Sequence, residues 1–216
     1  EQKAWATFNG ACEMDDLGFI TSWHEIPYEP QEYSTVVGLI GRRAGKSQIM
    51  CFMLLYEVLF GGHLSHVGED EDVVVPYLAQ DIFTAKSNMR KIVSIAKQSP
   101  KLYREITTDL KDKIQFKNGI TVLPEPPNVK TGRGVAIPVL IMDEVAFWYK
   151  AAENANPDFE VLRALSAAQI QFGRWGKKFI ISTPYTEEGL LWDYYLAGTN
   201  GHKLVKDEQS AYADTL

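Results

Sequence analysis

The feature that most constrains the fold of this 216-residue chain is a regular alternation of short apolar runs with longer helical patterns. Apolar, β-branched runs of roughly four to eight residues are typical of buried strands, and the stretches between them are typical of crossover helices. This alternation predicts an α/β fold, with a mainly parallel sheet covered by helices on both faces and one hairpin. The length fits one domain, or one domain with appendages.

The expected elements can be placed along the chain from local signals. A hairpin is expected at 113–123, because its Asn-Gly pair is the strongest short hairpin turn signal. A proline-rich loop follows it. Strands are expected at 33–40, 73–78, 137–142 and 178–182, and helices at 46–60, about 81–97, about 158–172 and from about 187 onward.

The segment GLIGRRAGKSQIM, at 38–50, ends like a phosphate-binding loop. The usual pattern is G-x-x-x-x-G-K-[ST], and the Gly-Lys-Ser at 45–47 supplies its end. The first glycine of the pattern would fall on Ile40, and the nearest glycine is Gly41. A Gly-Lys-Ser triplet is a weak signal alone, but a strand is expected before this loop and a helix after it, as a phosphate-binding loop requires.

In that setting the loop would hold a nucleotide. The backbone amides from Arg43 to Ser47, with Ala44 and Gly45 between them, would turn inward at a helix N-terminus and bind phosphate oxygens. Lys46 would reach the β- and γ-phosphates as a compact cation, and Ser47 would bind Mg²⁺ through its hydroxyl group.

A pair of acidic residues ends the run PVLIMDE, at 138–144. A strand there would deliver Asp143 and Glu144 to the sheet edge at which α/β proteins bind ligands. Asp143 would hold Mg²⁺ through water, and Glu144 would orient and polarise the attacking water in ATP hydrolysis. The alternative is an acidic strand end that caps the next helix. A third run, KKFIISTP, would place Ser182 and Thr183 beside the phosphates, on a strand between the other two.

These three motifs, in this order, resemble the ATPase domain of the large terminase subunit, the DNA-packaging motor of tailed bacteriophages and herpesviruses. The resemblance runs from about residue 30 to 195 and includes the segment at 73–93, the Asn-Gly-Ile hairpin and the Arg-Gly before the acidic strand. It implies a P-loop NTPase fold of the additional-strand, RecA-like type. The family often has a deviant phosphate loop with an arginine four residues before the lysine, which here is Arg42.

The resemblance also implies roles for single residues. Lys46 and Ser47 would bind ATP and Mg²⁺, and Arg42 would sense or stabilise the γ-phosphate. Ser182 and Thr183 would couple the nucleotide state to DNA movement. The expected site comprises the catalytic residues Glu144, Arg42 and Arg133; the nucleotide-binding residues Gly41, Arg43, Ala44, Gly45, Lys46, Ser47 and Gln31; the metal-binding residues Ser47 and Asp143; and the coupling residues Ser182 and Thr183.

Alternatives stay open for three of these residues. Arg133 would act as an arginine finger on a neighbouring subunit, an effect of roughly 10³–10⁵ in rate, or it belongs to a flexible loop and pairs with an acidic neighbour. Gln31 would contact adenine, although Tyr28 or Tyr33 could stack on the base instead. Arg43, included among the nucleotide-binding residues, fits a surface neighbour of Arg42 better than it fits a ligand.

The charge distribution bears on the expected partners. The net charge of −6 argues against a surface that grips nucleic acid everywhere, but the segment 86–117 carries nine Lys/Arg against three acids. This segment suits contact with DNA or with a subunit, and the alternative is a solvated helix and loop. The longest near-continuous apolar run, at 49–60, is too short to cross a bilayer, and two cysteines form no disulfide framework.

The leading interpretation is the ATP-hydrolysing motor domain of a viral large terminase, which translocates double-stranded DNA into a procapsid. By the resemblance, it would act with the portal protein and the small terminase subunit, as a pentameric homo-oligomeric ring in the cytoplasm of the infected bacterial host. The alternatives are a helicase-like ATPase and a nucleotide-binding module without turnover. The expected organisation is a segment at 1–32 packed on the ATPase core, the core at 33–200, and a tail or linker at 201–216. No nuclease activity is expected from this chain.

Overall fold

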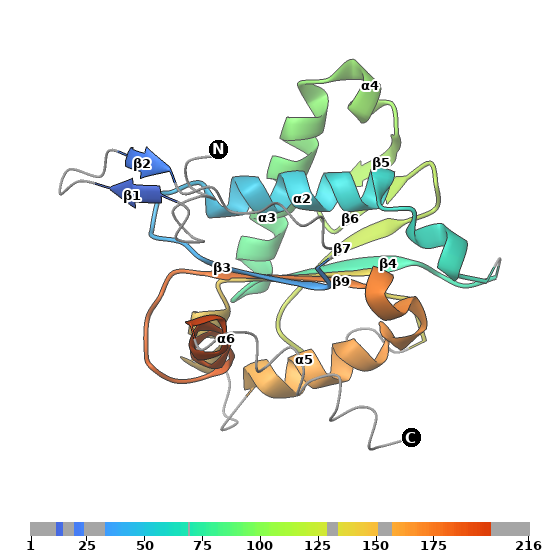
Figure 1. Ribbon diagram of the computed structural model, residues 1–216. Coiled ribbons are helices and arrows are strands. Elements are labelled where there is room, and N and C mark those ends of the chain that lie inside the picture. Colours follow the sequence, from blue (N-terminus) through green and yellow to red (C-terminus); the bar gives the residue numbers. More distant parts are fainter. Residues whose placement is uncertain are drawn as a thin grey trace. The chain divides into compact units, whose positions relative to one another are not determined.

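The computed structural model describes residues 12–14, 20–23, 33–68, 70–128, 134–150 and 157–199 (Figure 1). The chain divides into two compact units, Glu1–Glu32 and Tyr33–Leu216. In the first unit, β1 (Cys12–Met14) and β2 (Ile20–Trp23) pair as an antiparallel ribbon. The second unit carries all the other elements described below.

The second unit is built on a seven-stranded sheet with the strand order β3-β9-β8-β4-β7-β6-β5. The first five strands in this order pair in parallel, and β7, β6 and β5 pair in an antiparallel manner. The strand β9 lies between β3 and β8, as the additional-strand type of P-loop fold requires. The bounds are β3 (Thr35–Leu39), β4 (Val74–Leu78), β5 (Ile106–Leu110), β6 (Lys113–Phe116), β7 (Thr121–Glu125), β8 (Val139–Asp143) and β9 (Lys177–Ser182).

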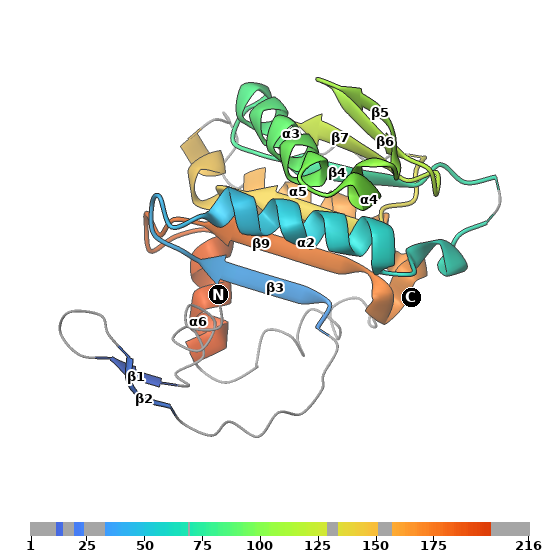
Figure 2. The ribbon, with the colours of Figure 1, turned by 90° about the horizontal axis from the view of Figure 1, so that it is seen from above.

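Helices cover both faces of this sheet. In Figure 1, α2 (Lys46–Phe60) and α3 (Ile82–Lys97) lie on one face, and α5 (Pro157–Ala167) and α6 (Leu190–Thr199) lie on the other. Figure 2 shows α2 and α3 side by side when the molecule is seen from above. The sheet therefore separates two hydrophobic cores.

The central strand β8 contributes alternating side chains to both cores. Val139 and Ile141 belong to the core beneath α2 and α3, whereas Leu140 and Met142 belong to the core beneath α5 and α6. All of β8 is buried, because successive residues of a strand point to opposite faces and both faces are covered here.

Several local predictions are confirmed. The helix α2 has the predicted bounds, Lys46–Phe60. The predicted hairpin joins β6 to β7, with Ile114 opposite Val122. Its turn uses Gly119 at φ 94° and the side chain of Asn118, whose Oδ1 accepts a hydrogen bond from the Ile120 amide. None of the described helices is long and apolar enough to cross a membrane.

Other elements differ from the predictions. The strand β5 and the short helix α4 (Pro100–Tyr103) were not expected. The β5 sequence ITTDL has no apolar run; three of its five residues are exposed and the other two are half-buried. The helix expected over 158–172 ends at Ala167 and is followed by a separate 3₁₀ helix, η3 (Ile170–Trp175). Gly173 interrupts helical geometry there with φ 49° and ψ −126°. The last helix begins at Leu190 rather than near 187.

Candidate nucleotide-binding site

The three predicted motifs meet at one edge of the sheet. The parallel register aligns Leu39 of β3 with Ser182 of β9, and Asp143 of β8 with Ile181 of β9. Because the strands run in the same direction, their carboxyl ends lie together, and the loops that follow them converge. The phosphate loop, the acidic pair and the Ser-Thr pair are therefore neighbours in space.

The phosphate loop bends around the N-terminus of α2. Gly45 precedes the helix at φ 82°, and Arg43 adopts φ 62°, a backbone conformation that residues other than glycine rarely adopt. The first turn of α2 has no side-chain cap and contains no acidic residue. The amides and the positive end of the helix dipole thus remain available to an anion at this point.

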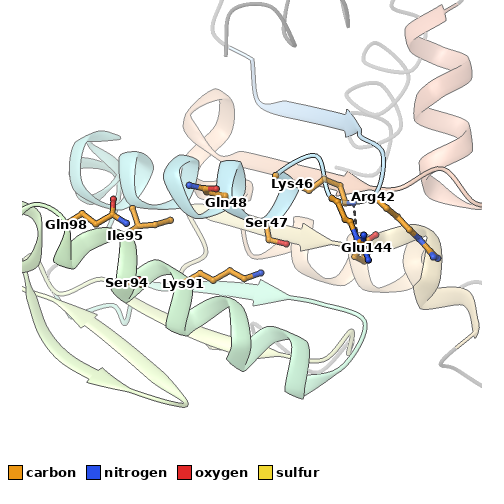
Figure 3. Close-up of a pocket in the computed structure, with 11 residues that line it drawn as sticks. Arg42, Lys46, Ser47, Gln48, Lys91, Ser94, Ile95, Gln98 and Glu144 are labelled. Atoms are coloured by element: carbon orange, nitrogen blue, oxygen red, sulfur yellow. Dashed lines mark ion pairs between the residues drawn. The ribbon is translucent and has the colours of Figure 1, made fainter. Parts of the chain in front are cut away.

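Lys46 joins the three motifs through one ammonium group. Its Nζ donates hydrogen bonds to Thr183 Oγ1 at 2.7 Å and to the Gly41 carbonyl at 3.2 Å. The same Nζ lies 3.4 Å from Glu144 Oε1, in an ion pair drawn as a dashed line in Figure 3. The Lys46 side chain is only 7% exposed, so these contacts fix its position inside the site.

Glu144 is held against its backbone preference. It adopts φ 56°, which costs about 1–3 kcal/mol for a residue with a Cβ atom. Its amide donates to the Ile181 carbonyl at 2.8 Å. Its Oε2 accepts hydrogen bonds from Ser182 Oγ at 3.2 Å and from the Thr183 amide at 3.3 Å. Strain of this kind clusters at functional sites, where surrounding contacts enforce it.

Asp143 is buried directly behind this carboxylate, with 1% of its surface exposed. Its Oδ2 accepts hydrogen bonds from Tyr77 Oη and from Asn88 Nδ2, both at 2.9 Å. Its Oδ1 is buried and has no partner among the described residues. Burial raises the pKa of Asp143 above its ordinary value, and the hydrogen bond from Tyr77 and the charge of Lys91 partly oppose the rise.

A hydrated Mg²⁺ fits the oxygen groups at this site. The part of the chain that the structure describes holds no cluster of three or more His, Cys, Asp or Glu side chains that could bind a metal. An ion here would therefore use Asp143, the Ser47 hydroxyl, water and phosphate oxygens. Mg²⁺ is commonly bound in this way, through one or two protein ligands, several waters and the phosphates of a substrate. Asp143 Oδ1, buried without a partner among the described residues, is an oxygen that could accept such an ion.

A cavity of about 650 Å³ opens between α2 and α3 beside these groups. Four basic side chains and one acidic side chain line it, a charge balance that favours a polyanion. Figure 3 shows Ser47 on α2 and Lys91 on α3 on facing walls. The full lining comprises Arg42, Arg43, Gly45, Lys46, Ser47, Gln48, Lys91, Ser94, Ile95, Gln98 and Glu144.

Six of the predicted site residues line this cavity: Arg42, Arg43, Gly45, Lys46, Ser47 and Glu144. Arg43 lines it beside Arg42, whereas Ala44 belongs to the loop but is exposed and outside the lining. Gln31 and Arg133 lie outside the described residues, so their predicted roles stay predictions. Gly41, Ser182 and Thr183 are hydrogen-bonded to Lys46 or Glu144, and Asp143 directly precedes Glu144 without lining the cavity.

The residues that were not predicted include Tyr77 and Asn88, which donate to Asp143, and Lys91, which lines the cavity. Two of them leave a signal in the sequence. Asn88 interrupts the apolar face of α3 that Ala85, Met89 and Ile92 form, and Tyr77 places a hydroxyl inside an apolar strand. A polar group at a core position needs a hydrogen-bond partner, and here both groups find Asp143.

The strand order and the loop geometry are those of the P-loop NTPase fold of the additional-strand type. No protein-family model matches the chain, and no curated protein matches it. Solved structures do match: the large terminase of bacteriophage HK97 aligns with 93% of this chain and 42% of its own, with 16% identity and a TM-score of 0.57. This chain therefore has the α/β fold found in that large terminase, and it spans 42% of that protein's length.

The ATPase domain of the large terminase of Thermus phage P74-26 is a weaker match. It aligns with 78% of this chain and 69% of its own, with 18% identity and a TM-score of 0.46. A point mutant of the same domain gives 78% and 70% coverage, 16% identity and a TM-score of 0.49.

Proposed function

We propose that this chain is an ATP-hydrolysing motor domain of the viral large terminase type, which moves double-stranded DNA into a procapsid. The observation that carries the proposal is the position of Lys46, whose ammonium group contacts both Glu144 and Thr183 at the entrance of a cationic cavity. One cation thus contacts the phosphate loop, the acidic pair and the Ser-Thr pair. The fold shared with the HK97 large terminase supports the choice of motor.

In this proposal, the triphosphate of ATP lies on the phosphate loop. The amides at the start of α2 and the ammonium group of Lys46 bind phosphate oxygens, and Arg42 neutralises charge on the γ-phosphate. Ser47 and Asp143 would hold a hydrated Mg²⁺, which would supply charge stabilisation to the phosphates. The Arg42 side chain is exposed and lines the cavity, which supports this role.

Glu144 orients the attacking water and accepts its proton. Its carboxylate forms an ion pair with Lys46 and accepts hydrogen bonds from Ser182 and Thr183. Phosphate oxygens compete for the ammonium group of Lys46, and this competition frees Glu144 Oε1 to bind water. The proposed reaction is attack of that water on the γ-phosphorus, with cleavage of the bond to the β-γ bridging oxygen and release of ADP and inorganic phosphate.

Ser182 and Thr183 couple this chemistry to movement. Thr183 Oγ1 accepts a hydrogen bond from Lys46, and the Thr183 amide donates to Glu144. The turn after β9 is therefore hydrogen-bonded both to the proposed phosphate-binding lysine and to the proposed general base. A change in either partner on ATP binding or phosphate release therefore displaces this turn. We propose that the displacement is transmitted to bound DNA.

The partners follow from the same proposal. The motor acts as a homo-oligomeric ring with the portal protein and the small terminase subunit, in the cytoplasm of the infected host. Arg133 of one subunit stabilises the transition state in the next, and Gln31 contacts the adenine base. These assignments rest on the family resemblance, because both residues lie outside the described parts of the chain.

The test is steady-state release of phosphate from ATP, with and without linear double-stranded DNA. Glu144→Gln is expected to lower turnover about 10²–10⁴-fold while ATP still binds, because a general base contributes a factor of this size. Glu160→Gln, an equal charge change at an exposed position of α5, serves as the matched control and should leave turnover unchanged. A wild-type chain that binds ATP without Glu144-dependent hydrolysis, even at high concentration, would be a nucleotide-binding module rather than a motor.

A further inference from the structure

A buried group of side chains behind the acidic pair has no role in the reaction described so far. Tyr77 comes from β4, Asn88 and Lys91 come from α3, and all three surround the Asp143 carboxylate or its immediate partner. Tyr77 is 0% exposed and Asn88 is 1% exposed. Polar groups buried this deeply on an apolar strand and an apolar helix face require a specific partner to offset their desolvation.

The hydrogen bonds divide the two oxygens of Asp143 into different roles. Tyr77 Oη and Asn88 Nδ2 both donate to Oδ2, at 2.9 Å each. Oδ1 remains buried without a partner among the described residues. Two donors on one oxygen fix the rotation of the carboxylate about its Cβ–Cγ bond. The unpaired oxygen is then held in one direction, and its position no longer depends on a ligand.

Lys91 determines which way the Asn88 amide faces. Its Nζ donates to Asn88 Oδ1 at 2.8 Å, on the side opposite Asp143. If the amide were reversed, its oxygen would face a carboxylate and its NH₂ group would face an ammonium, so both contacts would become repulsive. The charges at the two ends therefore select one amide orientation, in which Asn88 donates to Asp143.

Lys91 also reaches the cavity. It lines the wall of α3 that faces Ser47, and it forms no ion pair within the described parts of the chain (Figure 3). A continuous series of polar contacts thus runs from the cavity wall through Lys91 and Asn88 to Asp143. Tyr77 supports the same oxygen from the strand side.

We infer that Lys91, Asn88 and Tyr77 form a positioning relay that presents Asp143 Oδ1 to a divalent cation bound with the nucleotide. This inference rests on the proposed function, because it concerns the metal of the same site. The relay makes no contact with the reacting atoms, and it acts through the orientation of Asp143. Groups that orient a metal ligand in this way typically change metal affinity about 10–100-fold when they are removed.

The experiment measures divalent-cation binding directly. Mn²⁺ is titrated into the ATP-saturated protein, with free Mn²⁺ followed by its electron paramagnetic resonance signal. Tyr77→Phe removes a single hydroxyl and keeps the shape of the ring, and Asn88→Ala removes the bridging amide. Each is expected to weaken Mn²⁺ binding on the order of 10-fold, and ATP binding in the absence of metal should stay unchanged.

Lys91 is tested by a pair of variants with a matched control. Lys91→Met is expected to weaken Mn²⁺ binding by roughly a few-fold, because Lys91 acts on Asp143 only through Asn88. Lys91→Arg should bind Mn²⁺ almost as tightly as the wild type, because arginine keeps the positive charge. Lys101→Met makes the same charge change at an exposed position outside the cavity and should match the wild type.

A merely structural group of residues would behave differently. Tyr77→Phe and Asn88→Ala would then lower the thermal midpoint without any change in Mn²⁺ affinity, and this result would overturn the relay. Measuring ATP binding without metal distinguishes a failure of the relay from a failure of the proposed function. If the wild type binds ATP and Mn²⁺ and the variants match it, only the relay fails. If the wild type binds neither, the proposed function fails and the relay fails with it.

Discussion

The central parallel strands β9, β8 and β4, here called the parallel part, differ in burial and in chemistry from the end of the sheet formed by β7, β6 and β5, here called the antiparallel part. The outer parallel strand β3 is half-buried throughout. Every residue of β8 is buried, and β9 and β4 are nearly so, whereas buried and partly exposed positions alternate along β6 and β7. The edge strand β5 has no buried residue. The acidic pair, the Ser-Thr pair and Tyr77 all come from the parallel part. The antiparallel part contributes basic side chains such as Lys111 and Lys113.

The difference follows from the direction of the strands. Parallel strands bring all their carboxyl ends to one edge, so loops that are distant in the sequence can build one site there. Antiparallel strands alternate their ends and are joined by tight turns, so they do not concentrate loops. The turn of the β6–β7 hairpin instead anchors this part to α2, where Asn118 Nδ2 donates to the Val58 carbonyl at 2.8 Å. We expect the antiparallel part to serve contact and the parallel part to serve chemistry.

The largest expected effect tests this division at the phosphate loop. Lys46→Met should lower ATP turnover by about 10³-fold, because it removes a preorganised cation from the developing phosphate charge. Lys111→Met, the same charge change beyond β5, should leave DNA-independent turnover unchanged. Phosphate release measured at saturating ATP checks both. Equal losses in the two variants would contradict the division of roles.

Burial in the core beneath α2 should also slow the chemical modification of a cysteine thiol. Cys51 of α2 is 0% exposed, and burial raises its pKa from 9.0 to about 12. In a Cys12→Ser background at pH 8, alkylation by iodoacetamide should be slower by up to about 10³-fold in the folded protein than in urea, because the thiolate is the reactive form. Labelling monitored by mass spectrometry checks this. Rapid labelling of the folded chain would show that Cys51 is accessible.

The same pKa shift predicts a dependence of stability on pH. The neutral thiol is favoured in the folded state, so its contribution to stability is complete below about pH 9 and is lost as the pH rises toward about 12. Urea unfolding between pH 8 and pH 11, compared with Cys51→Ala, checks the direction. The alanine variant should be less stable at pH 8 and should lose less stability as the pH rises.

A third comparison concerns packing. Leu140 of β8 is 0% exposed, and Leu140→Ala should reduce the free energy of unfolding by about 2–5 kcal/mol, through lost burial and the cavity that remains. Leu110 of β5 is 58% exposed, and Leu110→Ala should change it by less than about 0.5 kcal/mol. Urea unfolding monitored by circular dichroism checks both. Similar losses would mean that β5 is as integral to the core as β8.

The smallest expected effect concerns DNA contact by the antiparallel part. If Lys111 contacts a phosphate, Lys111→Gln should reduce the slope of log affinity against log salt by about 0.9, with little change in ATP turnover. Arg163→Gln, at an exposed position of α5, is the control on the opposite face. Fluorescence anisotropy with a labelled duplex at several salt concentrations checks the slope. An unchanged slope would make the basic segment a solvated surface.

Sequence patterns identified the parts of this protein that depend on neighbours along the chain. The bounds of α2, the turn at Asn118 and Gly119, and the two carboxylates at the end of β8 were all predicted from local spacing. These features follow from helix periodicity, turn geometry and apolar runs, which a few consecutive residues decide. The position of β9 between β3 and β8 was expected from the family resemblance and is confirmed by the strand order.

Only the tertiary structure decided the contacts that give the site its electrostatics. The partners of Asp143 are separated from it by 66 and 55 positions, and Lys46 is 137 positions from Thr183. Such pairs form because strand order and helix packing bring them together, and no local spacing specifies them. The same holds for the positive φ of Glu144, which the surrounding hydrogen bonds enforce against its intrinsic preference, and for β5, which pairs with β6 without an apolar run of its own.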